Sequence, residues 1–276
     1  MSKNTGFSIT SAERYSLALF ELSEENNLLS QIEDQSSSML NLIYQSNDFS
    51  NLIKDPTIKQ EDLLKVINQI VENNKFDILF KNSLKGTELE EALDRICHEA
   101  KLMVSEGKNI IILSDRNISR VSAPIPALLA ISTVHHFLIR EGLRMKVSLI
   151  LETGEARELH HFSVLFGYGI EAINPYLAFE TIKSITSKND WQKSEDNFIK
   201  ASQKAIQKIM SKMGISTLKS YCGAQIFDAI GISEEVVNKY FTGTSTLIGG
   251  ISLEQIQKPS IQLSLSILRD LSNLWR

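Results

Sequence analysis

Two short polar segments of this 276-residue chain contain the side chains best suited to chemistry. Asp115, Arg116 and Asn117 follow one apolar run, and Glu152 follows the next. Both positions are expected carboxyl ends of strands, where α/β proteins place their reactive groups. Arg116 is a candidate anion contact, and Glu152 is a candidate general acid or base. Helix caps and loop salt bridges use the same residue types, so a structural role for all four residues stays open.

A glycine motif in the same region resembles a nucleotide-binding fingerprint. The segment 167–172 reads Gly-Tyr-Gly-Ile-Glu-Ala and satisfies G-x-G-x-x-A. That fingerprint works because its glycines lie between a strand and the next helix, whose first amide groups meet the pyrophosphate. Here the glycines follow a helical pattern and precede an apolar run, so the order is reversed. We interpret them as a turn that ends a helix, and we expect no cofactor.

Two histidine pairs suggest a metal site. Adjacent residues of a helix point about 100° apart, so neither pair chelates as an i, i+4 pair does. A site that takes one histidine of each pair with a cysteine lacks a C-x-x-C or H-x-x-x-H pattern. We therefore expect no metal, histidines that pack between helix and sheet, and a buried thiol at Cys222. The histidine pairs are His135-His136 and His160-His161, and the other cysteine is Cys97.

A repeating pattern of short apolar runs and helical segments positions the candidate residues. The runs 109–114 and 146–151 are rich in Ile, Leu and Val, as expected of strands buried on both faces. The helical patterns 124–141 and 155–166 follow them, and each ends at a glycine. We predict parallel βα units and an α/β fold that resembles part of a barrel. Further expected elements are helices at 88–105, 194–213 and 233–241 and a strand-like run at 173–178.

Composition divides the chain near residue 84. Only one of the 13 glycines, and none of the histidines or cysteines, lies in the first 84 positions. These positions hold 7 basic and 12 acidic residues, whereas the remainder holds 22 and 21. We expect a first unit at 1–84, a second at 85–257 and an unassigned tail at 258–276.

Composition also excludes several classes of protein. No apolar run approaches the roughly 18–20 residues that a membrane span needs, and the first residues show no secretory signal. The formal net charge of −4 gives no electrostatic footprint for nucleic acid. Two cysteines form no disulfide framework, which indicates reduced thiols and a cytoplasmic protein.

Residues 1–84 are predicted to form a separate all-helical bundle without catalytic residues. One helical pattern opens at Phe76 and includes Ile78, Leu79 and Phe80. The unit resembles the N-terminal domain of the ATP synthase delta subunit, the oligomycin-sensitivity-conferring protein of mitochondria. The resemblance implies a peripheral-stalk domain that binds an ATP synthase alpha subunit beside the inner membrane. The match stops inside the fifth helix, so the bundle is incomplete, and it rests on the segments 13–22, 26–28, 52–57 and 76–82.

Residues 85–257 carry a longer series of motifs. They resemble the later part of the central domain of the glutamate synthase large subunit. In that family, the enzyme makes two glutamates from glutamine and 2-oxoglutarate with FMN and an iron–sulfur cluster. The resemblance implies a scaffold, because the cysteine nucleophile, flavin-barrel and cluster motifs have no counterpart here. The matching segments are 113–117, 123–130, 135–136, 138–144, 158–162, 167–169, 172–180, 210–218, 221–227 and 240–244.

These resemblances together predict a chimera of a delta-type stalk domain and a glutamate synthase central-domain fragment. The leading hypothesis is a non-catalytic scaffold, related to glutamate biosynthesis and ammonia assimilation, without independent activity. Two alternatives stay open. In one, residues 1–84 dock on an alpha subunit, and in the other, the remaining glutamate synthase domains complete an active enzyme in trans.

Overall fold

The computed structural model divides the chain into two compact units, Met1–Ile70 and Val71–Arg276. The described residues are 16, 20, 68–82, 86–187, 190–258 and 260. The expected helical bundle at 1–84 and the tail at 258–276 therefore lie mostly outside the described residues. The fold and the site below concern the second unit alone.

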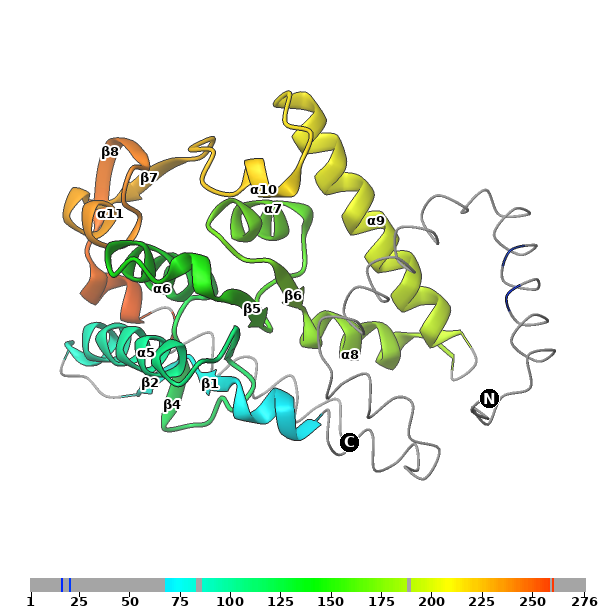
Figure 1. Ribbon diagram of the computed structural model, residues 1–276, viewed down its shortest axis with the longest axis horizontal. Coiled ribbons are helices and arrows are strands. Elements are labelled where there is room, and N and C mark those ends of the chain that lie inside the picture. Colours follow the sequence, from blue (N-terminus) through cyan, green and yellow to red (C-terminus); the bar gives the residue numbers. More distant parts are fainter. Residues whose placement is uncertain are drawn as a thin grey trace, which may run out of the picture. The chain divides into compact units, whose positions relative to one another are not determined.

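Four parallel strands form the central sheet of this unit (Figure 1). Their order along the sheet, β1-β3-β5-β6, follows their order in the chain, as in a βα barrel, although the described sheet is open. The α/β class and the parallel sheet are confirmed. The strands are β1 (Lys75–Asp77), β3 (Ile110–Ser114), β5 (Ser148–Glu152) and β6 (Ala172–Asn174).

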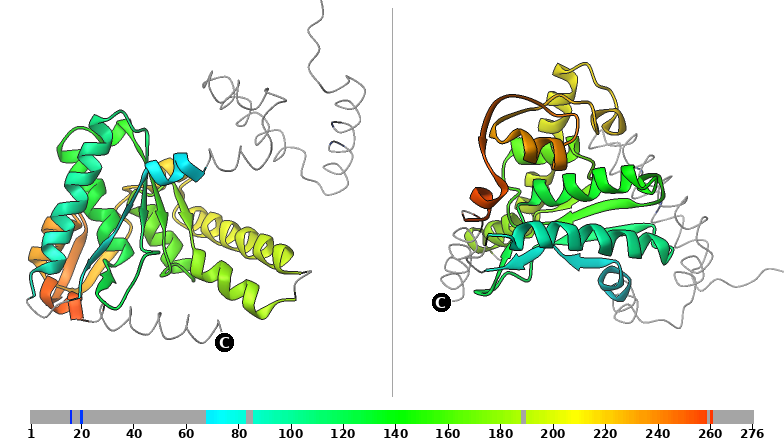
Figure 2. Two further views of the ribbon diagram at one scale, coloured as in Figure 1. Left: turned by 90° about the horizontal axis from the view of Figure 1, so that it is seen from below. Right: turned by 90° about the vertical axis from the view of Figure 1, so that its left-hand side faces the viewer.

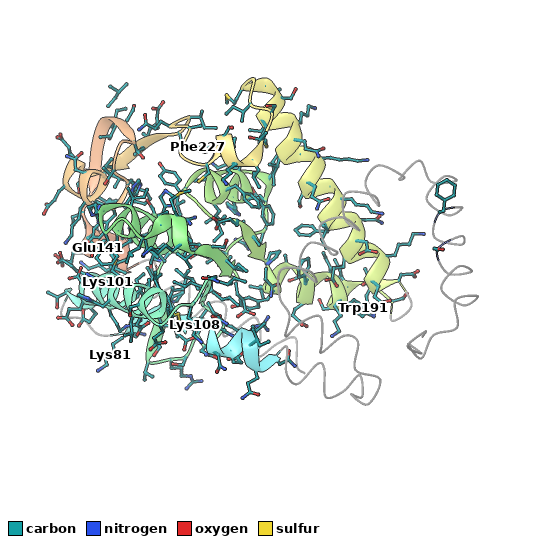
Figure 3. All side chains as sticks on the ribbon, in the orientation of Figure 1. Lys81, Lys101, Lys108, Glu141, Trp191 and Phe227 are labelled. Carbon is teal, nitrogen blue, oxygen red and sulfur yellow. The ribbon has the colours of Figure 1, made fainter. Side chains whose placement is uncertain are left out.

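Helices α5 (Glu88–Ser105) and α6 (Ala127–Arg140) lie side by side, and α7 (Leu159–Gly167) packs on α6 (Figure 2). The ion pair between Lys101 Nζ and Glu141 Oε2, 2.6 Å apart, links the first two near their carboxyl ends (Figure 3). Alternate strand residues are fully buried in the core with apolar residues of these helices, so burial of one sheet face organises the unit. These residues are Ile111, Leu113, Leu149 and Leu151 from the strands and Leu89, Leu93, Ile96, Ile131 and Leu138 from the helices.

The helix expected from Phe76 onward is wrong. Residues 75–81 form β1 and β2 (Leu79–Lys81), and β2 pairs antiparallel with β4 (Ser122–Pro124). Phe76, Ile78 and Phe80 alternate with less buried residues, which is the period of a strand. Consecutive apolar residues in this stretch hid that alternation. The two compact units of the structure meet after Ile70, and the domains expected at 1–84 and 85–257 stay a prediction.

The later elements agree with expectation in part. The long helix α9 (Trp191–Lys212) and the short helix α11 (Glu234–Tyr240) are confirmed, and Ser233 Oγ caps the latter by accepting from Val236 N at 3.4 Å. The strand-like run at 173–178 is shorter than expected, because helix α8 (Tyr176–Ile185) begins directly after Pro175, which occupies its N-cap position. The further elements are the 3-10 helix η1 (Arg144–Lys146), helix α10 (Leu218–Tyr221) and the parallel strands β7 (Asp228–Ile232) and β8 (Ser245–Ile251).

Within the residues that the structure covers, none of the helices combines the length and the apolar character needed to cross a bilayer.

The turn between α7 and β6 is held by a close approach of Gly169 to α6. Gly169 has φ +104°, and a Cβ atom placed there would overlap the ring of His135. Arg144 fixes both residues, since its Nε donates to His135 Nδ1 at 3.0 Å and its Nη2 donates to the Gly169 carbonyl at 2.7 Å. The expected reversal of the glycine motif is confirmed, because Gly167 ends α7 and β6 follows.

We expect Gly169→Ala to lower the free energy of unfolding by about 2–4 kcal/mol, because it adds backbone strain and a clash with a buried ring. Gly142→Ala is the matched control, since Gly142 has φ +69° but open space around its Cβ position. The control should lose only about 1 kcal/mol. Urea unfolding measures both, and equal losses would show that the close approach to His135 does not matter.

Candidate functional site

Strand register places four polar residues in one row across the carboxyl edge of the sheet. Asp77 pairs with Ser114, Ser114 with Glu152, and Glu152 with Asn174. Residues paired in this way point to the same face of a sheet. The row therefore brings side chains from β1, β3, β5 and β6 together. The expected position of Glu152 at the end of its strand is confirmed.

The Glu152 carboxylate is the centre of this row. It accepts hydrogen bonds from Ser114 Oγ at 2.6 Å and Arg116 Nε at 2.8 Å. Lys75 Nζ forms an ion pair with it at 3.0 Å, and Asn174 Nδ2 lies 3.4 Å away. Burial disfavours the charged carboxylate, but the hydrogen bonds from Ser114, Lys75 and Arg116 outweigh this effect and hold its pKa below the usual value. Glu152 is therefore an anion whose two carboxylate oxygens are both bound by groups of the protein.

Asp115 follows the row by one residue and points to the opposite face of the sheet. Its side chain is only 1% exposed. It accepts hydrogen bonds from Thr153 Oγ1 at 2.6 Å and Gly154 N at 3.0 Å, and the Tyr176 hydroxyl also donates to it. Burial nevertheless raises the pKa of Asp115 above its usual value, despite these donors. The Arg116 guanidinium lies 4.3 Å from the centroid of the Tyr176 ring. It thereby connects Glu152, on one face of the sheet, with Tyr176 and Asp115 on the other.

Three of the four predicted site residues thus share one network, and the fourth lies beside it. Asn117 Nδ2 donates to both oxygens of Asp77, at 3.0 and 3.1 Å. Sequence reasoning missed Lys75 and Tyr176 as members of this network. Lys75 directly precedes the helix that was expected to open at Phe76, and Tyr176 was expected in a strand-like run. The period-two pattern at 75–81 is the signal that could have placed Lys75 at a strand.

A cavity of about 750 Å³ adjoins the loop after β5. Its walls are mainly apolar, and Glu155 contributes a carboxyl group to it. Burial raises the pKa of Glu155 to about 7, although the Ala127 N–H donates to its Oε2 at 2.8 Å. This bond supplies the N-terminal cap of α6, which Pro126 does not provide. The walls include Leu128, Val164, Leu165, Phe227, Ile230 and Phe241, and Figure 3 marks Phe227 beside α7 and α10.

The arrangement indicates which groups are able to exchange protons near neutral pH. A general acid or base works best when its pKa lies near the operating pH. Hydrogen bonds from Ser114, Lys75 and Arg116 hold the pKa of Glu152 low, and the Asp115 carboxylate already accepts hydrogen bonds from three donors of the protein. Glu155 is the carboxyl group of this loop whose pKa lies near neutrality, and sequence reasoning did not single it out.

The histidine and thiol predictions meet mixed outcomes. Burial lowers the pKa of His135 to about 4, in keeping with a neutral packing residue, whereas His160 and His161 line the cavity. Burial raises the pKa of the Cys97 thiol to about 12 and also raises that of the half-buried Cys222, so neither is an activated thiolate. Among the described residues there is no group of three or more His, Cys, Asp or Glu that could hold a metal ion.

We expect Glu152→Gln to lower the free energy of unfolding by about 2 kcal/mol at neutral pH, because Lys75 and Arg116 lose their counter-charge. Since the folded-state pKa of Glu152 lies below 4.5, the stabilisation is present above that pH and is lost as the pH falls further. The control Glu141→Gln breaks the exposed pair with Lys101 and should cost less than about 1 kcal/mol. Similar losses in the two variants at neutral pH would contradict a special role for the Glu152 network.

We expect Glu155→Gln to raise stability at pH 8 by about 2 kcal/mol relative to wild type. As the pH rises above 4.5, the unfolded chain loses this proton first, and the folded protein keeps it until about pH 7. Wild-type stability should therefore fall across this window, and the variant should lack that fall because Gln does not ionise. The Gln side-chain oxygen still accepts from Ala127 N, so the cap of α6 is kept. Chemical unfolding across the window tests this, with the exposed Glu106→Gln as the control. Parallel profiles for wild type and Glu155→Gln would contradict the assignment.

Comparisons with known proteins agree with one of the two resemblances. The model of the family described as "Glutamate synthase central domain" matches residues 24–233. The Bacillus subtilis glutamate synthase [NADPH] large chain is 43% identical over 198 residues, and the Schizosaccharomyces pombe glutamate synthase [NADH] is 42% identical over 209. The ferredoxin-dependent glutamate synthase of Pyropia yezoensis is 35% identical over 257 residues. These matches cover 70%, 72% and 82% of this chain but only 13%, 10% and 17% of the three relatives.

The family match also bears on the expected chimera. It begins at residue 24 and extends past residue 84, where two unrelated parts were expected to join. One family therefore accounts for both sides of that position, and the comparisons lend no support to a delta-type domain there. Because the match covers most of the sequence and includes β1, β3, β5 and β6, the chain belongs to the glutamate synthase central domain family.

Proposed function

We propose that the described α/β unit is a scaffold of a glutamate synthase and works in glutamate biosynthesis together with the other domains of such an enzyme. The supporting observation is that its edge carboxylates are occupied by groups of the protein itself. Glu152 is bound by Ser114, Arg116 and Lys75, and Asp115 is bound by three further donors. Side chains engaged in this way fix strand ends and loops.

A catalytic role for these residues fits the geometry less well. A general base must reach a proton of the substrate and hold it at the working pH. Glu152 is stabilised as an anion by two cations, so it is a weak base. Asp115 is buried beneath Thr153 and Tyr176, so a substrate atom has no direct route to it. We therefore assign both carboxylates to the scaffold.

The proposed partners are the remaining domains of a glutamate synthase. The relatives are several times longer than the segment they share with this chain. The resemblance implies that those other parts carry the FMN, the iron–sulfur cluster and the nucleophilic cysteine. In this proposal the described unit contributes no catalytic residue and no cofactor ligand, whether its partners lie in the same polypeptide or are supplied in trans.

The rival proposal is docking of residues 1–84 on an ATP synthase alpha subunit. It stays a prediction from the sequence, and none of the described residues favours it. The family match over residues 24–84 instead supports the glutamate synthase assignment for most of that segment.

A segment exchange tests the scaffold proposal. The 198-residue segment of the Bacillus subtilis large chain that aligns with this chain is replaced by the corresponding residues of this chain. We expect a folded, active enzyme in which Glu152→Gln or Asp115→Asn lowers the thermal midpoint but leaves kcat per folded enzyme within about threefold. A catalytic acid or base would cost about 100-fold or more in kcat. A stable, cofactor-loaded variant with such a loss would overturn the proposal, and Glu106→Gln serves as the control.

A further inference from the structure

We propose that the cavity beside the loop after β5 is a binding site for a small organic cation. The ligand class is a protonated amine that carries an aromatic or aliphatic body. In this site Glu155 pairs with the ammonium group, and the apolar walls bury the body of the ligand. The proposal goes beyond the scaffold function and does not depend on it.

The cavity has the size and shape of a small-molecule site. The start of α6, the loop after β5, α7 and β7 line it, and all of them belong to one compact unit. Its volume of about 750 Å³ lies within the roughly 300–1,000 Å³ that small-molecule pockets occupy, whereas protein partners cover wider surfaces. The apolar lining residues include Leu128, Val164, Leu165, Ala229, Ile230 and Ile232.

One wall of the cavity is aromatic. The ring of Tyr168 is stacked with that of Phe227 at a centroid distance of 6.4 Å, and Phe241 meets Tyr168 edge-on at 5.5 Å. Phe227 packs closely on the chain, since a Cβ atom at Gly167 would lie 2.6 Å from its Cε2 atom. The Tyr168 hydroxyl is hydrogen-bonded to Thr244 Oγ1 at 2.7 Å. Aromatic faces attract organic cations and also bury apolar groups, so this wall suits both parts of the ligand.

Glu155 offers this cavity a carboxylate oxygen that the protein leaves unused. Its Oε2 accepts from Ala127 N at 2.8 Å, whereas no donor binds its Oε1 among the residues that the structure describes. Burial raises the pKa of this carboxyl group to about 7, so ionisation costs the fold free energy above that pH. An ammonium group at Oε1 would supply the missing partner and favour the ionised form. A carboxyl group in this condition, inside a cavity, is typical of a functional site.

The same features disfavour an anion as the ligand. A helix N-terminus attracts anions, but Glu155 already occupies the first turn of α6. Asp228 brings a second carboxylate to the cavity lining from β7. Arg157 also lines the cavity, yet its side chain is exposed to solvent. The charges that face the interior are therefore mainly negative.

Further titratable groups act on Glu155 or share its cavity. After burial, the charge of Asp115 raises the pKa of Glu155 further, and the charge of Arg157 opposes this rise. His160 and His161 of α7 line the cavity. His161 Nδ1 accepts from the Arg157 N–H at 3.3 Å, and His160 lies edge-on to Phe227. Protonation of either histidine would also disfavour a cation, so the experiment has to separate their effect from that of Glu155.

Isothermal titration calorimetry of the full chain with three probes of similar shape tests the proposal. The probes are 2-phenylethylamine, which is a cation, 2-phenylethanol, which is neutral, and 3-phenylpropanoate, which is an anion. At pH 8 the amine should bind wild type at least about tenfold more tightly than the other two. Glu155→Gln should remove this preference, and the matched control Glu106→Gln, which changes an exposed carboxylate on another element, should keep it. Val164→Phe fills the cavity from α7 and should weaken binding of the amine about tenfold or more.

The pH dependence separates Glu155 from the histidines. Since only the ionised carboxylate pairs with an ammonium group, the affinity of wild type for the amine should fall about tenfold from pH 8 to pH 6. Glu155→Gln should lack this fall. A fall of the same size in Glu155→Gln would assign the effect to other groups and overturn the role of Glu155.

Three further outcomes overturn the proposal. The first is a wild type that binds none of the probes at about 1 mM, and the second is equal affinity for cation and anion. The third is butylamine binding as tightly as 2-phenylethylamine, because a lysine side chain from another domain would then satisfy the site as well. Thermal melting of each variant shows that it is folded, and Glu155→Gln should melt no lower than wild type at pH 8, so its loss of binding would not reflect unfolding.

Discussion

The neutralisation of one partly buried carboxylate holds the edge of the sheet together. Glu152 stands at the end of β5 and is bound by Lys75 from β1 and by Ser114 and Arg116 from β3 and the loop after it. Three strands far apart in the chain thus converge on one negative charge. A buried charge without such partners would cost several kcal/mol, so the register of β1, β3 and β5 and the ionisation of Glu152 depend on each other.

The loop after β5 connects the sheet edge to the start of helix α6. Thr153 and Gly154 bind Asp115 on the opposite face of the sheet, and Glu155 then caps the first turn of α6. Pro126 leaves that turn without a side-chain cap of its own. The start of α6 is therefore positioned by a loop 28 residues later in the sequence. The same short loop forms part of the cavity wall. The hydrogen bonds that fix the sheet edge therefore also fix this wall of the cavity.

The sequence predicted the parts of the fold in which pattern and burial coincide. The runs at 109–114 and 146–151 are apolar enough to identify β3 and β5, and polar residues directly after them marked the edge. Strands β1 and β2 have only three residues each, and the consecutive apolar residues around them mask the period-two pattern at 75–81; their pairing with β3 and β4 decides their conformation. The ion pair of Lys75 with Glu152 depends on this pairing. Tyr176 was misplaced because a helix begins directly after Pro175, where the sequence suggested that a strand continues.

The approach of Gly169 to His135 has a consequence for how this sequence is able to change. Arg144 ties the imidazole and the glycine carbonyl to one guanidinium, so neither backbone nor ring has room to retreat. Any side chain at position 169 needs a smaller residue at 135, and a smaller residue at 135 leaves Arg144 without its nitrogen acceptor. Substitutions at positions 135, 144 and 169 are therefore coupled. Related sequences should keep all three residues or replace them together.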